Sequence, residues 1–391
     1  MKKLRILTTV HLANPGACIF TESLSHALKE TLPDFDVQVL NYLPRNWFLY
    51  EFARALKPNP KHPLLNFQRY IVSERFHREK LELDKNLLTM PAGYEGMVNF
   101  LEQQGYDALV VGMVVWDLVK KPFIPRYPNI YWLSENLSAK KIAYAVSGHR
   151  TDMRLFKENL LAIRKTLNSY SLIGVRDQIT HDMVLGAKLD NEIPVMRVPD
   201  PAFLHELEWD SEATKKVLEK NGLDLSRPLV GFIFHGNEKL ARELADFYHA
   251  KGYQIISLSM YNPYADVNLA HILTPHEWAN TFPLMSFCVT DRFHGTIMCL
   301  KAKIPFVSIE PYQPKTQGNS KIFSLLKDFE LLDSYFNQYE KGNTPDSLLE
   351  KAGYLQKEWQ GRYSQIVDKK LLEVKEKHNE FQGKIKAIFS L

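Results

Sequence analysis

The chain has 391 residues, a length that predicts two or three domains. Hydrophobic residues make up 45% and charged residues 24%, which is ordinary for a soluble globular protein and excludes wholesale disorder. The 49 lysines and arginines exceed the 45 acidic residues by four, giving a net charge of +4. This small excess argues against nucleic-acid binding, where a basic stripe is expected, but it is compatible with small anionic substrates.

Three cysteines, Cys18, Cys288 and Cys299, are too few and too scattered for a disulfide framework or a zinc site. A reducing compartment is therefore expected. The basic N-terminus leads into a short apolar stretch that favours a first strand, Leu4–Val10, over a signal peptide. No segment approaches the roughly 20 apolar residues that a membrane span needs. We expect a soluble, cytoplasmic protein.

The first half of the chain alternates short apolar runs with helical patterns. Each run is rich in Val, Ile and Leu and is too short for a helix, which predicts buried strands of a parallel sheet covered by helices on both faces. The expected strands are Leu4–Val10, Asp107–Gly112, Lys141–Val146, Ser171–Val175 and Pro194–Val198, with helices such as Phe20–Leu32 and Leu155–Leu167 between them.

A second alternation follows the polar, partly helical stretch Glu206–Pro228, which we interpret as the boundary region. Two successive arrays of this kind predict an α/β protein with two Rossmann-like, doubly wound domains facing a cleft. The expected strands are Leu229–Phe234, Tyr253–Leu258, Phe287–Thr290 and Ile304–Ile309, and the expected helices are Glu238–Ala250, Glu277–Met285 and Gly295–Lys301.

Two further regions lie outside this alternation. The tail Ser347–Ile388 has apolar residues at helical spacing and predicts a long C-terminal helix with a solvated charged face. The basic, aromatic region Trp47–Pro91 is the least regular and favours an inserted helical flap or a surface for an acidic glycan over a nucleic-acid site.

The strongest candidate site is the turn from Thr290 to Gly295, between an expected strand and the next helix. Arg292 would supply a fixed cation, His294 a titratable acid or base, and the helix N-terminus a positive dipole end. Gly295 would let a ligand approach the backbone. A structural role, with Arg292 paired to Asp291 and His294 capping the helix, remains an equal alternative.

Three other loops follow expected strands. Arg176, after the strand ending at Val175, could clamp a carboxylate or phosphate, whereas Asp177 is expected to cap the next helix. Asp200 lies between two prolines, and a binding role and a purely architectural one are equally favoured. The loop Asn14–Gly16 could bring backbone close to a ligand.

The remaining histidines are weaker candidates. His11 and His276 are expected to be solvated or to cap helices, and the same role is favoured for His149 and His235 over contact with a ligand in the cleft. Cys288 and Cys299 lie in apolar strand and helix patterns and are expected in the core.

Taken together, these motifs follow an order that a known family shares. They are the Asn14–Gly16 loop, a Gly…Trp element from Gly112 to Trp116, AVSGH (Ala145–His149), GVRD (Gly174–Asp177), DPAFL (Asp200–Leu204) and TDRFHGTIMCLKAKIPFVSI (Thr290–Ile309). The chain thereby resembles the polysaccharide pyruvyl transferase family over nearly its whole length, and the Arg-x-His-Gly turn of the last block is the most specific element.

The resemblance implies a phosphoenolpyruvate-dependent transferase. It would move the enolpyruvyl group onto a sugar of a cell-surface polysaccharide or its precursor, forming a pyruvate ketal and releasing phosphate. It also implies a glycosyltransferase-B-like fold, which we divide into an acceptor-side domain, 1–205, with a helical insertion at about 47–91, and a donor-side domain, 206–391. By this resemblance phosphoenolpyruvate would be the donor substrate; no further cofactor and no metal are expected.

By the same resemblance, Arg292 and His294 would be catalytic. Substrate binding would involve Arg176, Gly295, Lys321, with Lys315 as its competitor, and then Asn14, Gly16, Asp200, His149 and His235. The expected partners are phosphoenolpyruvate and a sugar acceptor, including a lipid-linked one. Any membrane contact would be peripheral, through the Trp47–Lys80 region at the inner face of the membrane.

Two departures from the family pattern concern acceptor recognition. Ala17 stands where many members have an acidic residue, and Met113 interrupts a Gly-Ser-Asp-type sequence before the tryptophan. They leave open a non-catalytic glycan- or anion-binding relative. A separate alternative is a glycosyltransferase of the same shape using a nucleotide sugar, but no motif supports Glu310 or Asp328 as its ribose-binding carboxylate.

Overall fold

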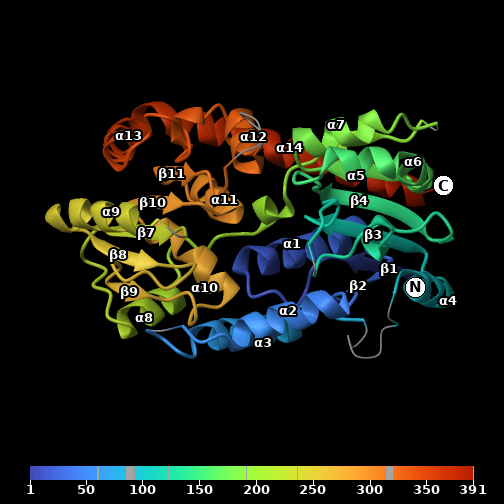
Figure 1. Cartoon of the computed structure of the whole chain (residues 1–391), viewed down its shortest axis with the longest axis horizontal. Helices are drawn as coiled ribbons and strands as arrows, with labels where there is room; N and C mark the ends of the chain where they lie inside the picture. The colour runs from blue at the N-terminus through green and yellow to red at the C-terminus, as the bar shows by residue number, and fades with distance from the viewer. Residues whose placement is uncertain are drawn as a thin grey trace. The chain divides into compact units, whose positions relative to one another are not determined.

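A computed structural model describes residues 1–59, 61–84, 91, 93–121, 123–190, 192–235, 237–313 and 320–390 (Figure 1). The chain divides into two compact units. Unit 1 comprises Met1–Ala55, Ser73–His205 and Val374–Leu391, and unit 2 comprises Leu56–Val72 and Glu206–Glu373. Neither unit is continuous in sequence: Leu56–Val72 belong to unit 2 and Val374–Leu391 to unit 1, whereas the sequence was divided into 1–205 and 206–391.

Unit 1 is built on a six-stranded, entirely parallel sheet in the order β2-β1-β3-β4-β5-β6. Its strands are β1 (Lys2–Leu7), β2 (Phe35–Val39), β3 (Ala108–Met113), β4 (Lys140–Val146), β5 (Leu172–Val175) and β6 (Val195–Arg197). Its helices are α1 (Pro15–Thr31), α2 (Arg45–Leu56), α4 (Tyr94–Gln103), η2 (Ile130–Trp132), α5 (Met153–Glu158), α6 (Leu160–Leu167), α7 (Gln178–Gly186) and η3 (Pro201–Leu204). Helix α3 (Leu65–Lys80) is divided between the units, and its part from Ser73 onwards belongs to unit 1.

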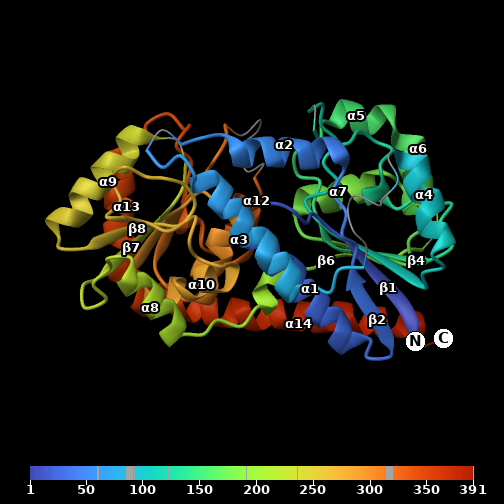
Figure 2. The ribbon, with the colours of Figure 1, turned by 90° about the horizontal axis from the view of Figure 1, so that it is seen from below.

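Both faces of this sheet are covered, so consecutive strand residues are buried in two different cores. In β3, Leu109 and Val111 belong to one core and Ala108 and Val110 to the other. Figure 2 shows the sheet edge-on, with the end of the C-terminal helix on one side and α5, α6 and α7 on the other. The near-continuous apolar runs of the sequence are explained by this double coverage.

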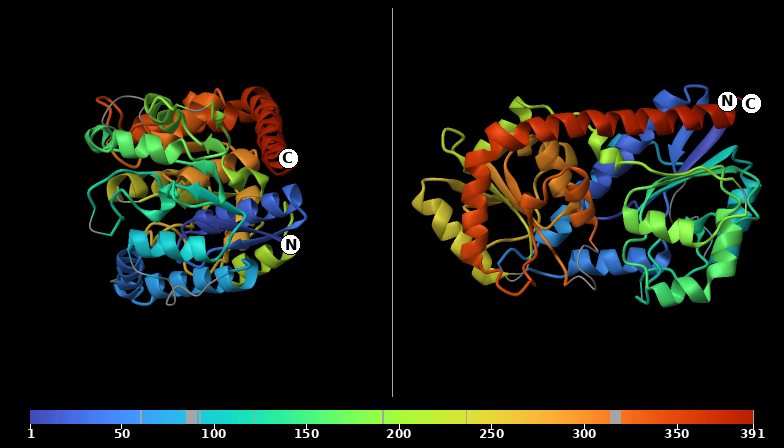
Figure 3. Two further views of the ribbon diagram at one scale, coloured as in Figure 1. Left: turned by 90° about the vertical axis from the view of Figure 1, so that its right-hand side faces the viewer. Right: turned by 90° about the horizontal axis from the view of Figure 1, so that it is seen from above.

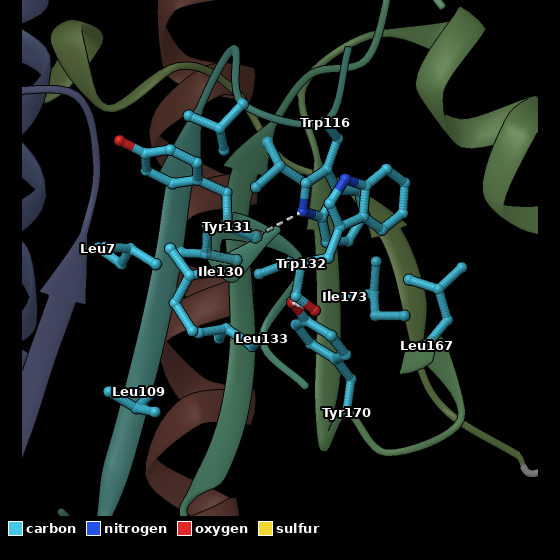
Figure 4. Close-up of a cluster of buried hydrophobic side chains, with 14 of the residues drawn as sticks. Leu7, Leu109, Trp116, Ile130, Tyr131, Trp132, Leu133, Leu167, Tyr170 and Ile173 are labelled. Carbon is cyan, nitrogen blue, oxygen red and sulfur yellow. Dashed lines mark hydrogen bonds between the residues drawn. The ribbon is translucent and has the colours of Figure 1, made fainter. Parts of the chain in front are cut away.

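The core on the α4–α7 side contains the tryptophan of the Gly…Trp element. Trp116 is fully buried, stacks on Trp132 with ring centroids 4.7 Å apart, and donates from Nε1 to Tyr131 O at 2.9 Å (Figure 4). Trp116 is therefore a packing residue of unit 1.

Unit 2 has a second six-stranded parallel sheet, in the order β12-β11-β10-β7-β8-β9. Its strands are β7 (Leu229–Ile233), β8 (Gln254–Ser257), β9 (Val267–Asn268), β10 (Phe287–Thr290), β11 (Phe306–Ile309) and β12 (Tyr335–Phe336). Its helices are α8 (Glu212–Lys220), α9 (Glu238–Ala250), α10 (Pro275–Asn280), η4 (Phe282–Leu284), α11 (Phe293–Lys301), α12 (Lys321–Asp328) and η5 (Leu332–Ser334).

A helical run of 45 residues ends the fold, composed of α13 (Pro345–Glu358), the π-helical turn η6 (Trp359–Tyr363) and α14 (Ser364–Phe389). Figure 3 shows α14 as a long red helix. The part of α14 that belongs to unit 1 buries Phe381 and Ile385 completely, and Tyr144 Oη lies 3.0 Å from His378 Nδ1. These buried side chains are why Val374–Leu391 group with unit 1.

The predicted fold class is confirmed: two parallel sheets with surrounding helices and a long C-terminal helix. Some elements differ in detail. The expected helix Leu155–Leu167 is divided at Asn159, whose φ of −107° is not helical, and the expected helix Glu277–Met285 is a short α10 followed by η4, where Pro283 cannot donate a helical hydrogen bond. None of the described helices is long and apolar enough to cross a membrane.

Candidate functional site

The Arg292–His294 turn lies at the point where the strand order of unit 2 reverses. From the central pair β7–β10, the chain places β8 and β9 on one side and β11 and β12 on the other. In open parallel sheets, ligands bind beyond the carboxyl ends of the strands at such a switch point. The loops there carry His235, after β7, and Asp291 to His294, after β10.

Asp291 ties these two loops together. The backbone N–H of His235 donates to Asp291 Oδ2 at 2.8 Å, and Arg292 Nε lies 2.9 Å from Asp291 Oδ1. Burial raises the pKa of the Asp291 carboxyl above its ordinary value. The pairing of Arg292 with Asp291, which the sequence left as an alternative, is thus present.

That pairing leaves part of the guanidinium available. Arg292 Nη2 is buried and has no hydrogen-bond acceptor among the described residues. Arg292 is also the N-cap of α11, without a side-chain capping bond. The N–H groups of the first helical turn therefore accompany a cationic donor, an arrangement suited to an anion.

Gly295 allows the turn to be this tight. A Cβ on Gly295 would lie 2.3 Å from Thr290 Oγ1, a distance that real Cβ atoms do not show. Thr290 Oγ1 accepts a hydrogen bond from the Arg292 N–H at 3.0 Å, so the threonine cannot simply move aside. His294 follows as a half-buried residue whose ring meets the Phe293 ring edge-on, with centroids 5.6 Å apart.

Lys321 belongs to the same group of residues. It is the first residue of α12, whose N-cap Ser320 accepts hydrogen bonds from the N–H groups of Ile322 and Phe323. Lys321 Nζ lies 5.3 Å from the centroid of the Phe293 ring, beside the α11 turn. Unit 2 thereby brings together Arg292, His294, Gly295 and Lys321, with His235 joined through its backbone; Lys315 lies outside the described residues.

In unit 1, Arg176 and Asp200 form a buried ion pair. The two side chains are 3% and 0% exposed, and Arg176 Nη1 donates to Asp200 Oδ2. Asp200 Oδ1 also accepts from the Ala202 N–H at 2.9 Å, which caps η3. The neighbouring Asp177 caps α7 as expected, accepting from the Thr180 N–H at 2.9 Å. Arg176 is thus held in a fixed orientation by Asp200.

The other candidates of unit 1 follow different strands. Asn14 caps α1, its Oδ1 accepting from the Gly16 N–H at 3.2 Å, and this loop lies beside the β1–β3 pair, where the strand order of unit 1 reverses. His149 follows β4, with Nδ1 3.1 Å from Ser147 Oγ and 4.0 Å from Asp117 Oδ1. Asn14 and Gly16 are therefore at a switch point, whereas His149, Arg176 and Asp200 are not.

His11 has a more elaborate environment than the sequence indicates. It adopts a positive φ of 63°, is 7% exposed, and places Nδ1 2.9 Å from Glu74 Oε2 and Nε2 2.6 Å from Asn41 Oδ1. Burial alone would raise the pKa of Glu74, but its contacts with His11 and His77 hold that pKa down at about 2. The sequence shows only that His11 follows the expected strand Leu4–Val10. Its contact with Glu74 could not be predicted, because the two residues are 63 positions apart.

The two parallel sheets and the long terminal helix define the glycosyltransferase-B-like class of α/β proteins, with an anion-suited turn at the switch point of unit 2. Within that class, the chain belongs to the polysaccharide pyruvyl transferase family, whose sequence model matches residues 14–312. The match includes Arg176, Arg292 and His294, and Lys321 lies beyond it.

Solved structures of the same fold share little sequence with the chain. The UDP-GlcNAc 2-epimerase of Methanocaldococcus jannaschii is 13% identical, with a TM-score of 0.53 and coverage of 91% of this chain and 93% of the epimerase. Phytolacca americana UGT2, solved with UDP-2fluoro-glucose and pterostilbene, is 11% identical, with a TM-score of 0.54 and full coverage of both chains. No curated protein sequence matches the chain.

Both departures from the family pattern lie beside the switch point of unit 1. Ala17 is 2% exposed in the first turn of α1, so an acidic side chain there would have to be buried. Met113 has a φ of 79° and accepts a hydrogen bond at Sδ from Thr9 Oγ1 at 2.7 Å. The departures therefore alter unit 1, and the turn of unit 2 keeps its pattern.

Proposed function

We propose that this protein transfers the enolpyruvyl group of phosphoenolpyruvate to two hydroxyls of one sugar in a cell-surface polysaccharide or its precursor. The product is a cyclic pyruvate ketal, and phosphate is released. Membership of the polysaccharide pyruvyl transferase family supports the reaction class. The observation that carries the assignment of the donor is the group of Arg292, His294 and Lys321 at the switch point of unit 2.

Phosphoenolpyruvate carries a phosphate and a carboxylate, so its binding needs several hydrogen-bond donors with positive charge. In this proposal Arg292 Nη2 and the first N–H groups of α11 bind one anionic group, and Lys321 Nζ the other. Arg176 of unit 1 is held by Asp200, and its role in substrate binding stays a prediction.

The chemistry begins with a proton delivered to the methylene carbon of the donor, which converts the double bond into an oxocarbenium-like centre. A sugar hydroxyl attacks that carbon and loses its proton, the phosphate leaves with its bridging oxygen, and the second hydroxyl closes the ketal while losing its own proton. His294 is the proposed general acid, since imidazole can carry a proton near neutral pH. Such proton transfer contributes about 10² to 10⁴ in rate.

The first test is His294→Gln, with phosphate release from phosphoenolpyruvate measured in the presence of sugar acceptors. We expect kcat to fall about 10²- to 10⁴-fold while calorimetry still detects phosphoenolpyruvate binding. The matched control is His249→Gln in the same unit, where His249 Nε2 pairs with Asp266 Oδ2 at 3.1 Å in a half-exposed position. If His294→Gln has the kcat of the wild type, His294 is not the general acid.

A separate arm tests the donor itself. Wild-type protein is incubated with phosphoenolpyruvate or with UDP-sugars, and free phosphate and nucleoside diphosphate are measured. The proposal expects phosphate only, together with a mass increase of the acceptor that corresponds to a pyruvate ketal. Release of UDP with transfer of the sugar would contradict it in favour of a glycosyltransferase.

A further inference from the structure

A second group of basic side chains lies within unit 2, at the loops that follow β8 and β9. One part of the group comes from the segment Leu56–Val72, and the other part comes from the two loops. The ring of His62 lies beside the rings of Tyr261 and His271, with centroids 5.2 and 5.8 Å apart. Loops at this edge of an open parallel sheet are where ligands bind.

Two further cations belong to the group. Lys61 Nζ lies 5.8 Å from the centroid of the Tyr261 ring, in the loop after β8. Arg69, in the part of α3 that belongs to unit 2, places Nη1 3.5 Å from Sδ of Met260, the residue before Tyr261. Two stretches that are far apart in the sequence thus bring four basic side chains together: Lys61, His62, Arg69 and His271.

The positive charge of the group is not neutralised by the protein around His271. Burial lowers the pKa of His271 below its ordinary value, and the charges of His62 and Arg69 lower it further. Among the described residues, no carboxylate opposes this effect. The carboxylate of the loop, Asp266, is engaged elsewhere, with Oδ2 3.1 Å from His249 Nε2. An anionic ligand would supply the counter-charge that the fold leaves out.

The loop after β8 also contains buried polar atoms without a partner. Ser259 Oγ and His271 Nδ1 are buried and have no hydrogen-bond partner in the part of the chain that the structure describes. The loop is held in place by two asparagines, since the Asn262 N–H donates to Asn268 Oδ1 at 2.7 Å and Asn268 Nδ2 donates to Asn262 O at 3.0 Å. Buried polar atoms of this kind need an explanation, and a ligand that hydrogen-bonds to them provides one.

We propose that this loop region is a binding site for a phosphate-type anion, held by the side chains of Lys61, His62, Arg69 and His271. The guanidinium and imidazolium N–H groups donate to the oxygens of the anion, and Lys61 adds charge. A phosphate suits basic groups that come from two sides, because its oxygens point in several directions, whereas a carboxylate offers two oxygens in one plane. The site shares no residue with the Arg292 turn.

The test is NMR of the full chain, with labelled histidine rings, during titration with inorganic phosphate, pyrophosphate, UDP or glucuronate. His62→Gln and His271→Gln identify the two resonances. At pH about 6, we expect phosphate and pyrophosphate to shift both resonances and glucuronate to leave them in place. Bound pyrophosphate should raise the pKa of His271 by about one unit, because a nearby negative charge favours the protonated ring.

The same titration distinguishes the sources of the phosphate group. Tighter binding of UDP than of pyrophosphate would identify a nucleotide as the ligand, and equal binding would identify the diphosphate alone. Affinity for either should fall between pH about 6 and about 8, as the histidines lose their protons. The titration contains no phosphoenolpyruvate, so its result does not depend on the proposed reaction.

Variants locate the anion. Arg69→Gln and His271→Gln should each weaken pyrophosphate binding about tenfold, since each removes hydrogen bonds from a charged donor. The matched control is Lys239→Gln on α9 of the same unit, which removes a cation whose side chain is 70% exposed and should bind as the wild type does. Arg292→Gln should retain the shifts of the His62 and His271 resonances. Circular dichroism verifies that each variant is folded.

Three outcomes would overturn the proposal. The first is that neither phosphate nor pyrophosphate shifts the His62 and His271 resonances, or that glucuronate alone shifts them. The second is equal affinity of Arg69→Gln and Lys239→Gln for pyrophosphate, which would mean that the ion is attracted without a site. The third is loss of both shifts in Arg292→Gln, which would place the anion at the Arg292 turn.

Discussion

At the scale of single residues, Gly295 is a position where backbone geometry decides the site. We expect Gly295→Ala to destabilise unit 2 by about 1–3 kcal/mol, because the new Cβ would meet Thr290 Oγ1 at 2.3 Å and force the turn apart. The displaced α11 N-terminus should also weaken phosphoenolpyruvate binding. Thermal unfolding and calorimetric titration measure the two effects.

Gly353 in α13 provides the control. A Cβ there meets nothing within 4 Å, so Gly353→Ala should stabilise by about 0.5–1 kcal/mol through helix propensity alone. Removing the obstructing hydroxyl in Gly295→Ala/Thr290→Ala should cost less than the sum of the single changes. Strict additivity of the two changes would show that Thr290 is not the obstacle.

Residue types and their order were enough to predict the Arg292, His294 and Gly295 turn, because a strand end, a cation and a helix start are local features of the sequence. The ion pair of Arg176 with Asp200 was not predictable, although both residues were candidates, since their side chains meet across 24 residues. The Asp291–Arg292 contact lies between neighbours and could be predicted as an alternative. Local patterns thus suggest candidate site residues, and only the tertiary fold shows which of them contact one another.

At the scale of elements, α3 is held to unit 1 by a pH-sensitive contact. Glu74 on α3 meets His11 after β1, and its pKa of about 2 is below its ordinary value of 4.5. A carboxylate with a lowered pKa stabilises the fold above pH about 4.5 and loses that contribution as the pH falls towards 2. The difference corresponds to about 3 kcal/mol.

We therefore expect the wild-type melting temperature to fall steeply between pH about 4.5 and 2, and Glu74→Gln to flatten that segment of the profile. Circular dichroism melts across this range provide the measurement. Glu79→Gln on the same helix should retain the wild-type slope, because Glu79 is 54% exposed and pairs with the exposed Arg75. If the melting temperatures of the wild type and Glu74→Gln fall in parallel over this pH range, the Glu74–His11 contact is not the source of the pH dependence.

The sequence predicted β1, β3, β4, β5, β6, β7, β8, β10 and β11 from their apolar runs. The expected burial of β6 was wrong, since all three of its residues are half-buried at the edge of the sheet. β2, an edge strand, was not predicted, although Phe35, Val37 and Val39 alternate with polar residues in the pattern of a half-buried strand. β9 and β12 are two residues long, too short to leave a periodic pattern. The orientation of helix α2 could not be predicted, since apolar residues occur all round the helix and hydrophobicity alone does not show which side packs inwards.

At the scale of the whole molecule, the C-terminal helix completes the core of unit 1. Phe381 is fully buried, its ring centroid lies 4.7 Å from that of Tyr144, and a Cβ on Gly174 would meet its ring atoms at 2.5 and 2.6 Å. Phe381→Ala should destabilise unit 1 by about 3–5 kcal/mol, whereas Leu372→Ala, at a position 64% exposed on the same helix, should change stability by less than about 0.5 kcal/mol.

Denaturant unfolding followed by circular dichroism gives both values. A cost for Phe381→Ala no larger than that for Leu372→Ala would mean that the helix end is dispensable to unit 1. This contact also explains why position 174, in the Gly174–Asp177 motif, is a glycine: a side chain there would occupy the space of the Phe381 ring.

The path of the chain between the units has a consequence for how the protein is made. The chain leaves or enters unit 2 after Ala55, Val72, His205 and Glu373, so neither unit is a continuous piece of sequence. During synthesis, the ribosome delivers every residue of unit 2 before it delivers Val374 and the helix end that covers β4 and β5 of unit 1. The usual order, in which the N-terminal domain finishes folding first, is therefore reversed. Until translation has passed through unit 2, the side of β4 and β5 that packs against Phe381 lacks this apolar partner.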